Sequence, residues 1–154
     1  MKTAQEIINE KGSEMVCVSP DTILIEAIQI MVDKRIGSIL VRQGGEIIGK
    51  WTEGDLLERI VVSDFDIHQV KIEDVMTRDF PTAPHTATVF SLMDRFLETR
   101  TRHLMIKRGE KYIGILSIGD AVRACLKEKD HELEVLSSQA SWEYYEEWRS
   151  KKIK

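Results

Sequence analysis

The sequence predicts an α/β (α+β) fold in which two β-α-β-β-α repeats pack with pseudo-two-fold symmetry and a C-terminal helical tail follows. The first observation is a duplicated corner, because Gly49-Lys50-Trp51-Thr52-Glu53-Gly54-Asp55 recurs 65 positions later as Gly114-Ile115-Leu116-Ser117-Ile118-Gly119-Asp120. Each corner also follows a glycine-containing turn and precedes apolar residues at helical spacing. Half a chain of 154 residues is too small to bury much apolar surface alone, so the two repeats must share a core.

The first repeat is assigned to residues 1–64. Asp21 or Thr22 is the expected N-cap of its central helix, and Gly37 is the expected end of that helix. Gly44-Gly45 forms the turn of a hairpin. The expected elements are a helix over 4–9, a strand over 15–18, the central helix between its cap and Gly37 with apolar positions from Leu24 to Val32, strands over 38–41 and 46–51, and a helix from Thr52.

The second repeat is assigned to residues 65–128 and follows the same plan. Pro84 matches Pro20 at a spacing of 64, whereas the strands match at 65. We therefore expect one extra residue between helix and strand in the second repeat. The expected elements are an opening segment over 70–76, a helix over 88–99, strands over 103–106 and 111–116, and a helix from Ser117.

Residues 129–154 form a predicted amphipathic helical extension with no counterpart in the first repeat. Its apolar residues step by three or four positions, which is typical of one helix face. This stripe either packs back on the repeats or forms a seam with another chain, since both use the same pattern. Its members are Leu133, Leu136, Ala140, Tyr144 and Trp148.

Composition excludes several classes of protein. A net charge of −4 argues against a nucleic-acid-binding face, and no apolar run has the length of a membrane span. Cys17 and Cys125 are isolated, so we expect buried free thiols, and the four histidines show no metal-ligand spacing. No activated nucleophile is recognisable. The expectation is a cytoplasmic protein that is not an enzyme and holds no metal or catalytic cofactor.

The two corners have two interpretations. Thr52 with Asp55, and Ser117 with Asp120, have the spacing of a helix capping box. The same groups suit a nucleoside phosphate, because a hydroxyl and a helix N-terminus bind phosphate and a carboxylate accepts hydrogen bonds from a ribose. Capping does not require the glycine before each aspartate, and Gly54 and Gly119 would let a ligand approach the backbone closely.

The ordered set of motifs resembles a tandem cystathionine-β-synthase (CBS) domain pair, the Bateman module, over about residues 1–128. The resemblance is carried by the two corners together with shorter motifs in each repeat. These motifs are Val18-Ser19-Pro20-Asp21-Thr22, Ile36-Gly37-Ser38-Ile39-Leu40-Val41, Pro84, Thr86 and His103-Leu104-Met105-Ile106.

The resemblance implies clefts between the repeats that bind AMP, ADP, ATP or S-adenosylmethionine. Thr52 and Ser117 would contact phosphate, and Asp55 and Asp120 the ribose. Segments that contain Ser19, Ser38, Thr82 and His103 would line the adenine pockets. Such modules usually form homodimers and regulate a partner protein. Lys50-Trp51 departs from the small aliphatic pair usual at this position, and Trp51 is placed to narrow the first cleft or to stack on a base.

The resulting hypothesis is a stand-alone regulatory module that senses an adenine nucleotide through a shift between two arrangements of its repeats. The alternative is a ligand-free interaction or dimerisation scaffold, in which both corners serve only as helix caps.

Overall fold

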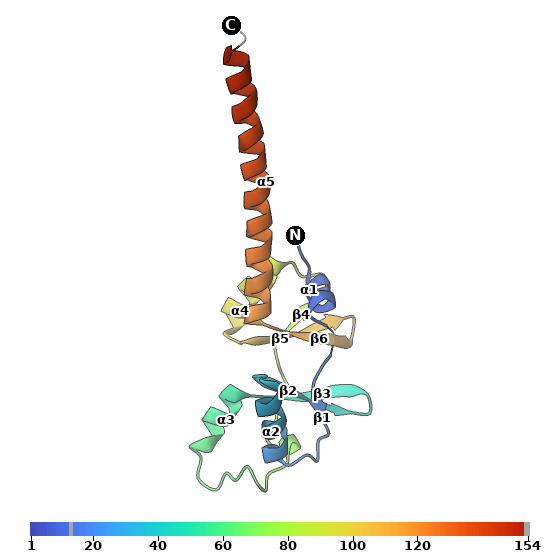
Figure 1. Cartoon of the computed structure of the whole chain (residues 1–154). Helices are drawn as coiled ribbons and strands as arrows, with labels where there is room; N and C mark the ends of the chain where they lie inside the picture. The colour runs from blue at the N-terminus through green and yellow to red at the C-terminus, as the bar shows by residue number, and fades with distance from the viewer. Residues whose placement is uncertain (13, 153–154) are drawn as a thin grey trace.

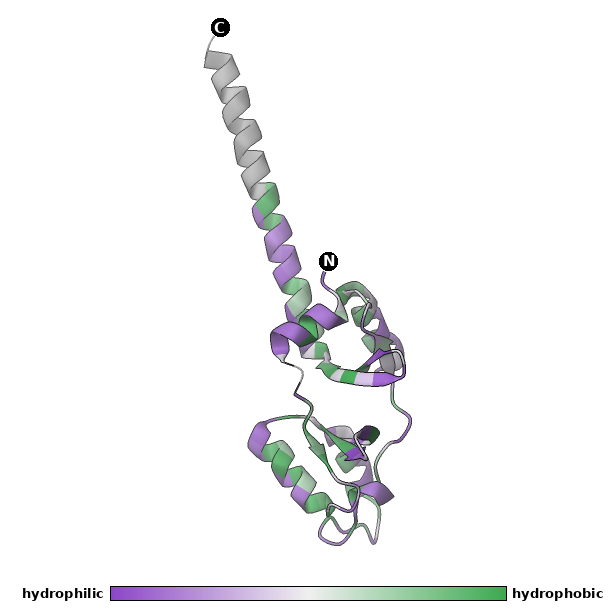
Figure 2. Cartoon of the chain, turned by 90° about the vertical axis from the view of Figure 1, so that its right-hand side faces the viewer, coloured by the Kyte–Doolittle hydropathy of each residue, from purple (hydrophilic) through white to green (hydrophobic). Residues whose placement is uncertain are grey.

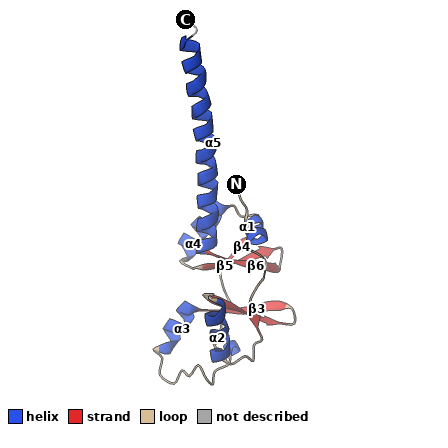
Figure 3. Cartoon of the chain, viewed as in Figure 1, coloured by secondary structure: helices blue, strands red, loops and turns tan. Residues whose placement is uncertain are grey.

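The chain folds into two small sheets that face each other, with helices on their outer sides (Figures 1 and 3). The computed structural model describes residues 1–12 and 14–152, with side chains described up to Leu136 of the last helix. The elements, in order, are α1 Ala4–Lys11, β1 Cys17–Val18, α2 Leu24–Lys34, β2 Ser38–Gln43, β3 Glu46–Thr52, α3 Glu53–Ile60, the 3-10 turn η1 Ile72–Asp74, β4 Thr82–Pro84, α4 Val89–Thr99, β5 His103–Arg108, β6 Lys111–Ser117 and α5 Ile118–Lys152. The predicted order β-α-β-β-α is confirmed in both halves.

The two sheets repeat each other residue for residue. Their strand orders are β1-β2-β3 and β4-β5-β6, each with one parallel and one antiparallel pair. The prediction of one extra residue between helix and strand in the second repeat is wrong. The pairs Cys17↔Leu40 and Thr82↔Met105 show a spacing of 65 already in the first strand of each sheet. Pro84 is therefore the equivalent of Ser19, because it lies inside its strand.

Three apolar layers hold the sheets and helices together. Alternate strand residues point to opposite faces of a sheet. Outward residues of the first sheet, including Ile39 and Trp51, pack with Leu24 and Ala27 of α2. Outward residues of the second sheet pack with α4 and α5. A smaller cluster built on Leu40, Phe80 and Met105 fills the space between the sheets.

The opening segments of the two repeats are exchanged in space. Helix α1 packs on the second sheet, where Ile8 joins the second core, whereas Met76 joins the first core. Two glycines permit these crossings. A Cβ on Gly114 would lie 2.9 Å from Cδ1 of Ile8, and a Cβ on Gly49 would overlap the Met76 sulfur. Each half of the core is therefore completed by a segment from the other half of the sequence.

Both expected ends of α2 are wrong. Its N-cap is Ile23, which makes no side-chain capping bond. The Ser19 hydroxyl instead donates to Asp21 at 2.7 Å and lies 3.1 Å from the Thr22 hydroxyl, so these side chains close a turn before the helix. The helix ends at Lys34, and Arg35 takes the left-handed conformation with φ 54°.

The predicted helical tail is confirmed as the far part of the single helix α5, which extends away from the sheets (Figures 1 and 2). Leu133 and Leu136 are 63% and 60% exposed, so packing of this part of the stripe against the repeats is not observed. The side chains of Ala140, Tyr144 and Trp148 lie outside the described residues. No described helix combines the length and apolar character needed to cross a membrane.

Candidate functional site

Both corners form complete capping boxes. The Thr52 hydroxyl accepts a hydrogen bond from the Asp55 amide at 3.2 Å, and Asp55 Oδ2 accepts one from the Thr52 amide at 2.9 Å. Ser117 and Asp120 repeat both bonds at 3.2 and 2.8 Å. Each hydroxyl acts as an acceptor in its cap, so its own hydrogen remains available to a ligand oxygen. Capping and ligand binding are therefore compatible uses of the same residues.

A cavity of about 350 Å³ lies between the first corner and the start of β5. One wall comes from the corner and contains Thr52, Glu53, Gly54 and Asp55. The facing wall is the segment Arg100–His103, which leads from α4 into the second sheet. The cavity therefore joins the N-terminus of α3 to a basic segment of the other repeat.

Gly54 keeps the backbone open at this cavity. A Cβ there would meet nothing closer than the Thr52 hydroxyl at 3.7 Å, so neither packing nor backbone conformation requires a glycine. The equivalent Gly119 is similar, with Ser117 Oγ at 3.6 Å. Both glycines instead leave the first turn of the helix bare, as close approach by a ligand would need.

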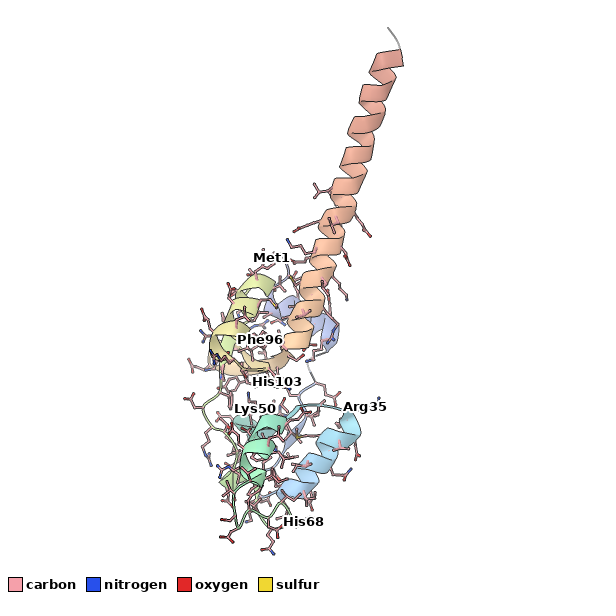
Figure 4. All side chains as sticks on the ribbon, turned by 90° about the vertical axis from the view of Figure 1, so that its left-hand side faces the viewer. Met1, Arg35, Lys50, His68, Phe96 and His103 are labelled. Atoms are coloured by element: carbon pink, nitrogen blue, oxygen red, sulfur yellow. The ribbon has the colours of Figure 1, made fainter. Side chains whose placement is uncertain are left out.

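His103 occupies the inter-sheet side of the cavity (Figure 4). It shares its strand face with Met105, which packs between the sheets. Burial, followed by the charges of Lys50 and Lys11, lowers the pKa of His103 to about 4. The imidazole is therefore neutral at pH 7 and offers one donor and one acceptor to a base or a phosphate.

The second corner is already occupied by the protein's own side chains. Lys11 Nζ lies 2.6 Å from Asp120 Oδ2, and Arg123 lies 2.8 Å from Oδ1. Burial alone would raise the pKa of Asp120, but hydrogen bonds from Lys11 and from the Ser117 backbone outweigh burial and lower that pKa. A cavity of about 140 Å³ adjoins Asp120, and neither Ser117 nor Gly119 lines it.

The other predicted site residues lie apart from the 350 Å³ cavity. Ser19 is exposed in the turn after β1, and Thr82 is half-buried in β4. Ser38 pairs with Thr52 across β2 and β3, directly beside the cavity wall. Among the predicted residues, the cavity thus gathers Thr52, Gly54, Asp55 and His103.

One contact of the site, that of Lys11 with Asp120, carried no recognisable sequence signal. Lys11 is one of many lysines, and its contact with Asp120 spans 109 positions. The prediction that Trp51 narrows this cleft or stacks on a base within it is wrong, because Trp51 does not line the cavity. Its ring is fully buried on the opposite face of the sheet, in the core beneath α2.

Comparison with known proteins identifies the class. The CBS domain family matches residues 5–62 and 72–127, which together span most of the chain. The chain therefore belongs to the CBS-domain family and carries two CBS domains in tandem. Among the described residues no cluster of three or more acidic, histidine or cysteine side chains could hold a metal ion.

Two curated relatives show how such a pair occurs elsewhere. The chain is 32% identical over 133 residues to the mitochondrial CBS domain-containing protein CBSX3 of Arabidopsis thaliana, with 82% of this chain and 64% of that protein covered. It is 28% identical over 118 residues to the arabinose 5-phosphate isomerase KdsD of Yersinia pestis, with 76% of this chain and 36% of the enzyme covered. The chain thus spans less than two thirds of either relative.

Solved structures confirm the fold. A crystal structure of a CBS domain protein matches with a TM-score of 0.76 and 32% identity over 82% of this chain and 99% of that one. The structure of CBSX2 in complex with AMP matches with a TM-score of 0.68 and 22% identity, covering 84% of this chain and 99% of that one. At that identity the second likeness concerns the fold alone.

Proposed function

We propose that this chain is a non-enzymatic regulatory module that binds an adenine nucleotide in the cavity between its two CBS domains. The cavity itself carries the proposal, because it sets a hydroxyl, a bare helix N-terminus and a carboxylate opposite a basic segment. A phosphate suits the helix N-terminus and the Thr52 hydroxyl, and a ribose suits the Asp55 carboxylate. The AMP found in CBSX2, which shares this fold, supports the choice of ligand class.

The proposal assigns the first corner as the open site. Both carboxylate oxygens of Asp120 form ion pairs, one with Lys11 and the other with Arg123. Among the described residues, Asp55 has no ion pair within 4.0 Å. A ribose at the second corner would have to displace two cations. AMP, ADP and ATP all fit the chemistry of the first corner, and S-adenosylmethionine shares the adenosine part.

Isothermal titration calorimetry with AMP, ADP, ATP and S-adenosylmethionine tests the proposal. Asp55→Asn keeps an oxygen for the Thr52 amide but removes the charge, and Asp120→Asn is the matched control at the equivalent corner. Charge-assisted hydrogen bonds contribute about 1.5–3 kcal/mol, so Asp55→Asn should weaken binding about ten- to hundredfold. Saturating ligand at 100 times its Kd should also stabilise the wild type by about 2.7 kcal/mol.

A ligand-free scaffold remains the second candidate, favoured by the complete capping boxes. It predicts no heat of binding and no thermal stabilisation by millimolar concentrations of any of these four compounds. It also predicts that Asp55→Asn affects stability alone.

We further propose that the module is a homodimer that acts on a partner protein. Exposed apolar residues recur at equivalent positions of the two domains, as Val32 with Leu97, Leu57 with Val122, and Val61 with Leu126. A duplicated exposed apolar face is typical of an interface rather than of chance surface composition. The exposed Leu133 and Leu136 of α5 would extend that interface. The proposed location is cytoplasmic, although the Arabidopsis relative is mitochondrial.

A further inference from the structure

Lys50 is a charged residue in an apolar position. It lies on β3 opposite Leu40, on the strand face that looks toward the other sheet. It is 4% exposed. Its equivalent in the second domain is Ile115, which packs in the cluster between the sheets. One of two equivalent inter-sheet positions therefore holds an amine in place of a hydrocarbon.

The Lys50 ammonium has no anionic partner. No carboxylate lies within 4.0 Å of it among the described residues. The ammonium lies over the ring of Phe80, with Nζ 5.7 Å from the ring centre. Burial lowers the pKa of Lys50, and the charge of Asp55 opposes that shift. A buried cation without a partner is unfavourable, so the site is incomplete as an ion pair.

Lys50 is not among the residues that line the cavity of the first corner, but residues beside it are. Lys50 and Thr52 are two positions apart on one strand, so their side chains share a face. Thr52 lines the cavity, as does His103, which lies beside Lys50 at the junction of the two sheets (Figure 4). Arg100 and Arg102 add positive charge on the facing wall, opposite the carboxylates of Glu53, Asp55 and Glu58.

We propose that Lys50 is the counter-charge for a ligand phosphate, so that the cavity selects phosphate-bearing adenine nucleotides over adenosine. The inference rests on the proposed nucleotide-binding function and narrows its ligand class. A phosphate at the N-terminus of α3 gains a charge-assisted contact with the ammonium.

Calorimetry with AMP, ADP and adenosine tests this selectivity in the full chain. Lys50→Ile installs the type of residue found at the equivalent position, and Lys34→Gln removes an exposed lysine as a control. The wild type should bind AMP at least tenfold more tightly than adenosine. Lys50→Ile should lose that ratio while keeping its affinity for adenosine, and Lys34→Gln should change neither value. An unchanged AMP-to-adenosine ratio in Lys50→Ile would overturn the inference.

A titration with pyrophosphate alone separates this inference from the nucleotide proposal. Pyrophosphate should shift the Cε resonance of Lys50 in the NMR spectrum of the wild type and raise its melting temperature, but not that of Lys50→Ile. If adenosine compounds bind and pyrophosphate leaves the Lys50 resonance unmoved, nucleotide binding stands and the role of Lys50 is wrong. If pyrophosphate shifts the Lys50 resonance and raises the melting temperature but no adenosine compound binds, the anion site is supported and the nucleotide proposal is wrong.

Discussion

The ammonium of Lys11 lies 2.6 Å from Oδ2 of Asp120, which joins the end of α1 to the first turn of α5 across 109 positions of sequence. Asp120 is 9% exposed and also holds Arg123 and the Ser117 amide. The carboxylate therefore ties the exchanged N-terminal helix to the second domain. This role is structural, whatever the second corner binds.

Asp120→Ala should consequently destabilise the protein by about 1–3 kcal/mol, because it leaves the Ser117 amide and the Lys11 ammonium without their acceptor. Urea unfolding measures the loss. Lys11→Met retains the aliphatic part of the side chain and supplies the second arm of a double-mutant cycle. A coupling energy near zero between the two substitutions would show that the ion pair contributes nothing.

Acid should weaken the fold through His103. Burial and the neighbouring Lys50 lower the pKa of His103 to about 4, whereas an unfolded histidine titrates near 6.5. The unfolded state therefore binds more protons between these values, and stability falls as the pH decreases through them. Between pH 7.5 and 5 the loss attributable to His103 is about 2 kcal/mol.

Urea unfolding of the wild type and of His103→Asn at both pH values measures this contribution. The variant should show a smaller loss between pH 7.5 and 5. His68→Asn, a histidine substitution at an exposed position, serves as the control. Equal pH dependence in wild type and His103→Asn would contradict the assignment.

Gly49 should be intolerant of a side chain. A Cβ at this position would overlap Met76, so Gly49→Ala should cost about 1–3 kcal/mol of stability. Gly54→Ala is the matched control, because its nearest neighbour would be 3.7 Å away and alanine favours the helix. Thermal unfolding compares the two. In the double variant Gly49→Ala/Met76→Ala, the loss of stability should be smaller than the sum of the two single losses, because the overlap is gone. Losses that simply add would show that Met76 is not what the new side chain meets.

The duplicated apolar face should hold two chains together. Leu57→Glu and Val122→Glu place a charge at equivalent exposed positions. Each should shift the equilibrium from dimer toward monomer, because a buried unpaired charge is unfavourable, and analytical ultracentrifugation measures this as a lower mass. Gln43→Glu adds the same charge at the exposed end of β2 and should leave the mass unchanged. A wild-type protein that sediments as a monomer at micromolar concentration would contradict the dimer.

The sequence by itself determined the repeat, the order of elements and the two corners. These depend on local patterns, namely the alternation of strand residues, the helical spacing of apolar residues and the hydroxyl-to-aspartate spacing that caps α3 and α5. The same patterns occur in both halves of the sequence, so the element order predicted for one half supports the order predicted for the other. The spacing of the prolines gave a wrong alignment of the repeats, because Pro84 lies within β4 whereas Pro20 follows β1.

Only the tertiary structure decided which residues meet. The sequence treats the corners as equals, yet Asp55 borders an open cavity and Asp120 is held by Lys11. The exchange of α1 between domains, which brings Lys11 to Asp120, depends on Ile8 fitting over Gly114. The exchange thus relies on contacts between residues about a hundred positions apart in the sequence. No local sequence pattern specifies such contacts. The same holds for Lys50 and Trp51, whose adjacent side chains point to opposite faces of one strand, so that the amine joins the inter-sheet layer and the indole joins the core.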